Sequence, residues 1–246
     1  MKKFCALKIF VIGVIFSSAM IFSANCSADV DYRSVDVTYL KDIVGNWYDT
    51  KGNLVLTISS DYKLNGCPIM SVGFTADTVA LYKIVINEGN RNRTIELEYS
   101  GSAERGYYEE LEMNKNILRK TKNPQYFESI GGIYLRMDKN QVVSLYGEPS
   151  KKFTDYDNST WEYKNLGLKI VFYLNVVREI TIYEYGDRKF DWSGLSGRNT
   201  MYEFERKYNS SFSQRGNLRI GHGELINFNK SNNSVTLSIF PPGGLY

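Results

Sequence analysis

The sequence is poor in histidine, cysteine and proline, and the first two shortages exclude whole classes of site. Its 246 residues include one histidine, three cysteines and five prolines. The single imidazole, His222, excludes metal sites built on several histidines. Two of the cysteines, Cys5 and Cys26, lie in the first 28 residues. If that segment is removed, Cys67 has no intramolecular disulfide partner, and the fold depends on its hydrophobic core.

The sequence also lacks a charge imbalance beyond its N-terminus. The net charge of +3 equals the contribution of Lys2, Lys3 and Lys8, because residues 1–28 contain no acidic residue; the remainder has 27 acidic residues and as many basic ones. A nucleic-acid-binding protein needs a basic surface for the phosphates. The densest basic run, Lys115–Lys122, faces acidic residues across a predicted hairpin. We therefore predict no nucleic-acid partner.

Catalytic motifs are missing as well. Gly131-Gly132 is an isolated pair and no Gly-rich phosphate loop is present, and no pair of carboxylates stands in a glycosidase frame. Cys67 and His222 lie far apart in the sequence, and a structural thiol and a loop histidine explain them better than a nucleophile with its base. The sequence predicts no enzyme, no catalytic or metal-binding residues and no cofactor.

One long apolar run occurs, and it lies at the N-terminus. Lys2 and Lys3 precede the apolar run Ile9–Phe22, and the small residues Cys26-Ser27-Ala28 follow it. This layout is typical of a cleavable secretory signal, and no later segment approaches the roughly 20 apolar residues of a membrane span. We predict that residues 1–28 are a signal peptide, that the protein is exported to the periplasm or the extracellular space, and that it has no integral membrane span. A lipoprotein anchored through Cys26 is the alternative.

Residues 29–128 predict a β-rich domain. After an amphipathic stretch, Val37–Val44, short alternating segments are separated by turn residues. The predicted strands run near Trp47–Asp49, Leu54–Ser59, Cys67–Phe74, Val79–Asn87, Thr94–Tyr99, Tyr107–Met113 and Ile117–Thr121. The pattern indicates an antiparallel β-meander curled into a half-barrel. Gly45-Asn46-Trp47 after a short N-terminal helix is similar to the opening of lipocalin-like domains, which implies a barrel that is either filled or hollow enough for a ligand.

Residues 129–190 predict a helix followed by an antiparallel sheet. Asp138 and Gln141 form a capping box, and Gly147 with Pro149 ends the helix. The alternating strands that follow are Trp161–Tyr163, Leu168–Leu174 and Val176–Tyr185, with a tight turn at Asn175.

A weaker copy of this pattern is predicted in residues 191–246. Thr200 and Glu203 form a second capping box, and Asn209 stands where Gly147 ends the first helix. Two further strands, Glu224–Phe228 and Val235–Phe240, follow. The pattern indicates either a degenerate duplication or one larger α+β domain.

Several motifs in this half carry a family resemblance. They are the run of residues 132–149, Trp161-x-Tyr163, Ile170-Val171-Phe172 and Val177-x-x-Ile180. Together they resemble the BamE-like (SmpA/OmlA) family, whose fold is also that of β-lactamase inhibitor protein-like modules. The resemblance implies a helical layer on an antiparallel sheet, used for protein contacts in the bacterial envelope. The predicted fold class is therefore α+β, with an N-terminal β-meander or half-barrel followed by BamE-like modules in tandem.

The function predicted from these features is non-enzymatic binding. One face of the first module's sheet presents Tyr173, Tyr183 and Tyr185, which we predict to contact an envelope or extracellular protein, because tyrosine gives contact area at small entropic cost. The same face could instead be covered by the N-terminal β region. The alternative function is a lipocalin-like carrier of a small apolar ligand.

Overall fold

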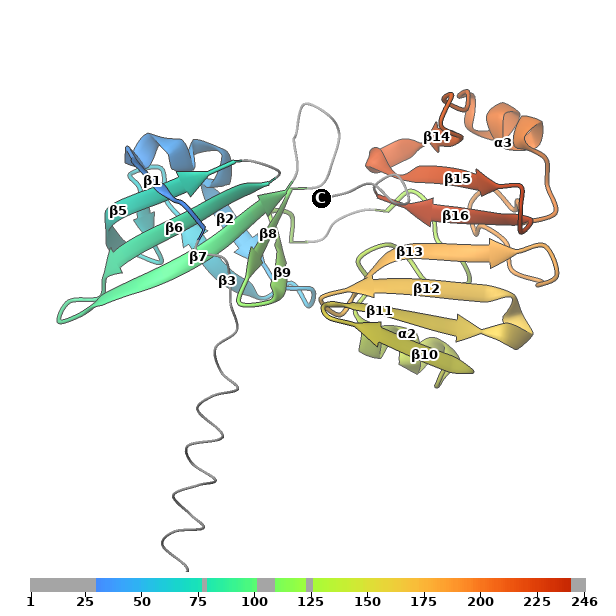
Figure 1. Cartoon of the computed structure of the whole chain (residues 1–246), viewed down its shortest axis with the longest axis horizontal. Helices are drawn as coiled ribbons and strands as arrows, with labels where there is room; N and C mark the ends of the chain where they lie inside the picture. The colour runs from blue at the N-terminus through green and yellow to red at the C-terminus, as the bar shows by residue number, and fades with distance from the viewer. Residues whose placement is uncertain (1–29, 77–78, 101–108, 123–125, 240–246) are drawn as a thin grey trace, which may run out of the picture. The chain divides into compact units, whose positions relative to one another are not determined.

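A computed structural model describes residues 30–76, 79–100, 109–122 and 126–239 (Figure 1). The predicted signal peptide, residues 1–28, lies outside these ranges. The described residues from Arg33 to Ile239 form one compact unit. Strands account for 47% of the structure and helices for 15%, so the protein is mostly β.

The described part of the N-terminal half contains nine strands and one 3₁₀ helix. They are β1 (Arg33–Val35), η1 (Val37–Ile43), β2 (Gly45–Tyr48), β3 (Leu54–Ile58), β4 (Lys63–Leu64), β5 (Cys67–Thr75), β6 (Ala80–Asn87), β7 (Asn92–Ser100), β8 (Glu110–Met113) and β9 (Asn116–Arg119). Each strand predicted from this half of the sequence is present in the described residues, and Tyr107 and Tyr108 of the predicted strand Tyr107–Met113 lie outside them. The short strands β1 and β4 were not predicted, since three and two residues are too few to show alternation.

Eight of these strands close into an antiparallel barrel. Their order is β5-β4-β3-β2-β9-β8-β7-β6, and β6 pairs back onto β5. Closure depends on the nine-residue strand β5, which pairs with β4 at Cys67 and Pro68 and with β6 from Ile69 to Thr75. The half-barrel predicted from the sequence is therefore wrong. The physical reason is that pairing β5 with β6 removes two free strand edges.

The amphipathic stretch before the barrel forms η1, and its apolar face joins the barrel core. Asp36 caps its first turn by accepting a hydrogen bond from the Thr38 N–H at 2.9 Å. Leu40 and Ile43 are fully buried in the core cluster of the barrel, and the indole N–H of Trp47 donates to the Ile43 carbonyl at 2.8 Å. This bond satisfies the one polar atom of a buried indole.

Residues 126–239 contain seven strands, two α-helices and two short 3₁₀ helices. They are α2 (Lys139–Tyr146), β10 (Lys151–Asp155), β11 (Asn158–Tyr163), η3 (Lys164–Leu166), β12 (Leu168–Tyr173), β13 (Val176–Tyr183), α3 (Met201–Tyr208), β14 (Asn217–Arg219), η4 (Gly221–Gly223), β15 (Leu225–Asn229) and β16 (Ser234–Ser238).

Local signals at both α-helices are confirmed. Asp138 with Gln141 and Thr200 with Glu203 form capping boxes, so α2 and α3 begin where the sequence places them. The tight turn between β12 and β13 is also present, and Asn175 adopts a φ of 69° there. Such a left-handed conformation suits the two-residue turns of hairpins.

The predicted α+β class with tandem helix-on-sheet modules is contradicted. The seven strands form a single sheet of order β10-β11-β12-β13-β16-β15-β14 (Figure 1). β13 of the first predicted module pairs with β16 of the second, from Glu179–Ser238 to Tyr183–Ser234. The helices are only eight residues each, and Val142 of α2 and Phe204 of α3 lie in one core cluster with the sheet. The physical reason for a single sheet is that pairing β13 with β16 satisfies backbone N–H and C=O groups that two separate sheets would leave exposed at their edges. The boundaries predicted at residues 128 and 190 stay predictions.

Candidate binding sites

The interior of the barrel is apolar. Its buried side chains form one cluster, which includes Trp47, Leu56, Ile58, Leu64, Val72, Tyr82, Ile84, Ile86, Ile95, Leu97, Leu111 and Leu118. Burial raises the pKa of Tyr82 to about 12, so its hydroxyl is uncharged at neutral pH. An interior of this kind discriminates against charged ligands, because a charge transferred into it would lose its hydration.

The structure separates the three tyrosines predicted to bind a partner. The Tyr173 hydroxyl donates to Glu112 of β8 at 2.8 Å, and the guanidinium of Arg178 lies 5.1 Å from its ring centre. Tyr183 and Tyr185 instead stack on each other, with ring centres 5.3 Å apart and planes within 16°. Tyr185 keeps 64% of its surface exposed. Two of the three rings therefore form one group, and Tyr173 makes contacts of its own.

A β-bulge explains why Val177 does not lie on the face that the alternating pattern predicted for it. The register shifts between Val171 and Phe172, so Phe172 pairs with Val177. As a result Val177 lies in the core with Ile180, whereas strict alternation along the strand put it on the same face as the tyrosines. A bulge adds one residue to one strand and reverses the alternation beyond it.

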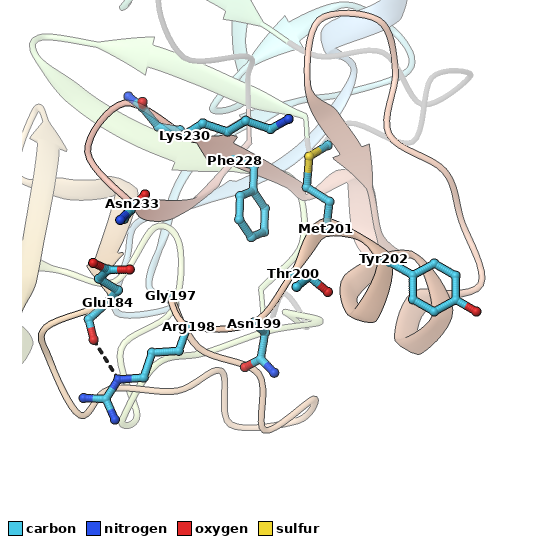
Figure 2. Close-up of a pocket in the computed structure, with 11 residues that line it drawn as sticks. Glu184, Gly197, Arg198, Asn199, Thr200, Met201, Tyr202, Phe228, Lys230 and Asn233 are labelled. Carbon is cyan, nitrogen blue, oxygen red and sulfur yellow. Dashed lines mark hydrogen bonds between the residues drawn. The ribbon is translucent and has the colours of Figure 1, made fainter.

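A pocket of about 570 Å³ lies among the segment before α3, the first turn of α3 and the ends of β15 and β16 (Figure 2). It is lined by Glu184, Gly197, Arg198, Asn199, Thr200, Met201, Tyr202, Phe228, Asn229, Lys230 and Asn233. A smaller pocket of about 280 Å³ shares Tyr202 and is otherwise lined by Glu205, Arg206, Asn209, Ser210 and Ser211. Sequence reasoning used this region only to place a helix. Tyr202 was the available signal, because a large aromatic side chain stands next to Thr200 and Glu203 of the capping box.

Two buried carboxylates hold the segment that precedes the second sheet. Glu224 accepts hydrogen bonds from the backbone N–H groups of Phe127 at 2.8 Å and Glu128 at 3.0 Å. Glu128 in turn accepts from the N–H groups of Trp192 at 3.2 Å and Ser193 at 3.1 Å, and from the Tyr208 hydroxyl. Burial raises the pKa of Glu224 to about 7, although the two N–H groups act in the opposite direction. These hydrogen bonds join the segments around Phe127, Trp192 and Glu224 to one another.

A third buried carboxylate, Glu110 of β8, is paired with arginines. It forms ion pairs with Arg136 and, at 3.1 Å, with Arg178. Burial alone would raise the pKa of Glu110, but the two guanidinium groups outweigh it and hold that pKa below its ordinary value. A paired, fully buried carboxylate of this kind has a structural role.

Cys67 and His222, weighed above as a reactive pair, are held on different elements. Cys67 is a free thiol on β5, partly exposed, and His222 is exposed in η4 with a φ of 58°. Over the described ranges, no group of three or more histidine, cysteine or acidic residues is placed to hold a metal ion. None of the helices in these ranges combines the length and apolar character needed to cross a membrane.

Comparisons of the chain with family models, with curated proteins and with solved structures found no match. The resemblances to BamE-like and lipocalin-like families therefore stay predictions from the sequence.

Proposed function

We propose that this protein is a non-catalytic binding protein whose barrel carries a small apolar ligand. The observation that supports the proposal is the closed eight-stranded barrel with an apolar interior. Barrels of eight strands have an interior that side chains can fill or that can take one small ligand.

The chemistry of the interior defines the ligand. Aliphatic side chains dominate the core cluster, and the Trp47 and Tyr99 rings meet edge to face with centres 6.3 Å apart. The Tyr99 hydroxyl is already engaged, because it donates to Glu109 at 3.1 Å. A hydrocarbon chain or an uncharged ring system fits such a lining, since binding would bury apolar surface without leaving a buried polar group unpaired.

The test uses Trp47 as the reporter. With Trp161 and Trp192 replaced by Phe, the remaining tryptophan lies in the barrel core, and energy transfer from it to the apolar fluorophore N-phenyl-1-naphthylamine measures binding inside the barrel. We expect saturable transfer that a long-chain alcohol displaces.

Neighbouring positions on β3 supply the matched variants. Leu56 is 1% exposed in the core and Val55 is 38% exposed on the outside of the same strand. Leu56→Phe should reduce the affinity about tenfold by filling the interior, whereas Val55→Phe should leave it unchanged. Absence of saturable transfer in the parent protein, or equal affinity in the two variants, would contradict the carrier proposal.

The stacked tyrosines favour a second function, in which an exported bacterial protein binds another envelope or extracellular protein. Tyr183 and Tyr185 offer a paired aromatic surface, and interface aromatics often contribute about 2 kcal/mol or more to binding. Replacing both with Ala should weaken co-purification of a partner from the cell envelope. Tyr173→Ala is the comparison, because Tyr173 is engaged with Glu112 and its loss should reduce stability instead. Equal binding by the parent protein and the double variant would remove this function.

A further inference from the structure

We propose that Tyr202, together with the two pockets that share it, forms a binding site for a neutral oligosaccharide. Tyr202 is 68% exposed, although it stands in the first turn of a well-anchored helix. It belongs to the lining of both the pocket of about 570 Å³ and the pocket of about 280 Å³.

The Tyr202 ring is carried on a firmly held backbone. The Thr200 N–H donates to Glu203 at 2.7 Å, the Glu203 N–H donates to the Thr200 hydroxyl at 3.3 Å, and the Asn199 amide donates to Glu203 at 3.0 Å. Phe204, two residues further on, is fully buried in the core of the sheet. An aromatic ring held in this way loses little conformational entropy when a ligand packs against it.

Polar groups with spare hydrogen-bonding capacity surround the larger pocket. The side chains of Glu184, Lys230 and Asn233 make no hydrogen bond or ion pair with any other described residue. Figure 2 shows Glu184 and Lys230 on different sides of the pocket, with Met201 and Phe228 between them and the helix. A carboxylate that accepts, an ammonium that donates and an amide that does both match the hydroxyl groups of a sugar, which donate and accept at once.

The apolar part of the lining suits the other face of a sugar. Met201 and Phe228 come from α3 and β15 and line the same pocket as Tyr202. A pyranose ring presents C–H groups on its faces and hydroxyl groups around its edge. Figure 2 shows the Tyr202 ring pointing away from Glu184, Phe228 and Lys230. One unit of the oligosaccharide would therefore stack its C–H face on Tyr202, and the hydroxyl groups of further units would bond to the polar side chains of the larger pocket.

The same region is poorly suited to an extended peptide or a polyanion. β15 is paired with both β14 and β16, and β16 with both β13 and β15, so these strands have no free edge to which a peptide could add. Glu184 offsets one of the two cations in the lining, Lys230 and Arg198, and the Arg198 guanidinium is already bonded to the Glu184 and Gly186 carbonyls. A polyanion selects a cluster of open cations instead.

An oligosaccharide array tests the proposal directly. The array carries neutral and sialylated oligosaccharides and is probed with the whole protein, and the strongest neutral oligosaccharide is then titrated calorimetrically. We expect Tyr202→Ala to weaken that binding about tenfold or more and Tyr202→Phe to preserve it, because stacking needs the ring and not the hydroxyl. Tyr156→Ala is the matched control, since Tyr156 is a 96% exposed tyrosine between β10 and β11.

Thermal unfolding of each variant separates loss of the site from loss of the fold. Tyr202→Ala should unfold at the temperature of the parent protein, because the exposed ring contributes little to the core. Absence of array signal above background, a preference confined to sialylated oligosaccharides, or equal affinity in the parent and Tyr202→Ala proteins would overturn the proposal. Selective binding of an unglycosylated peptide library through Tyr202 would also overturn it, since the ligand would then be of another class.

Discussion

Glu224 should make the protein less stable as the pH rises through neutrality. This carboxyl is fully buried, and its pKa is raised from 4.5 to about 7, with burial as the largest cause and the neighbouring Glu128 acting in the same direction. The backbone N–H groups of Phe127 and Glu128, and the charge of Arg136, oppose the change without cancelling it.

The sign follows from proton binding. Between about pH 4.5 and about pH 7 the folded protein holds a proton on Glu224 that the unfolded chain has released, so stability falls as the pH rises. The contribution is complete below the unfolded pKa and is lost as the pH passes the folded pKa. A pKa change of this size corresponds to about 3 kcal/mol.

Urea unfolding followed by tryptophan fluorescence measures this effect. Between about pH 5 and about pH 8, the free energy of unfolding of the parent protein should fall by up to about 3 kcal/mol relative to that of Glu224→Gln, which carries no titrating group at this position. The quantity to compare is the difference in unfolding free energy between the parent protein and Glu224→Gln at each pH. The profile of the parent protein alone is not enough, because burial also raises the pKa values of Glu98 and Glu179. Glu184→Gln is the control, since Glu184 is exposed and should leave the profile of the parent protein unchanged. Parallel profiles for the parent protein and Glu224→Gln would contradict a raised pKa of Glu224 in the folded protein.

Three further predictions concern the buried ion cluster, the helix anchor and the N-terminus. Glu110→Gln removes the counter-charge of two buried arginines and should lower the free energy of unfolding in urea by about 3–5 kcal/mol. Asp61→Asn breaks the exposed pair with Lys63 and should lower it by less than about 1 kcal/mol. Similar losses of stability in both variants would show that burial does not control the effect. Phe204→Ala should lower the free energy of unfolding by about 3–5 kcal/mol, because it leaves a cavity under α3. A loss of stability as small as that expected for an exposed ring would mean that Phe204 does not anchor α3 on the sheet. Mass spectrometry of the protein from its source should place the mature N-terminus near Asp29, and an intact Met1 or a lipid-modified Cys26 would contradict cleavage as a soluble exported protein.

Signals carried by neighbouring residues were sufficient for the local structure. The capping residues Asp138 and Thr200 define the starts of α2 and α3, because the side-chain bonds of each capping box join residues no more than three positions apart. Alternation along Leu54–Ile58 and Leu168–Tyr173 likewise predicts strands, since side chains of a strand point to opposite faces in turn.

Partners distant in sequence decided the rest. Closure of the barrel depends on β5 pairing with β6, and the single C-terminal sheet depends on β13 pairing with β16 across about fifty residues of chain. No local feature of Glu179–Tyr183 identifies Ser234–Ser238 as its pairing partner, because many alternating strands can form hydrogen bonds with the same backbone groups. Dependence on distant segments also explains why the surroundings of the three tyrosines and the pocket beside α3 were not predicted. Local patterns in the sequence were enough to predict the longer strands, the turns and the helix starts, but not the short strands β1, β4 and β14 or the exposed strand β10. The contact of Tyr173 with Glu112, and the pocket that Tyr202 lines with Phe228 and Lys230, form only when distant segments pack together.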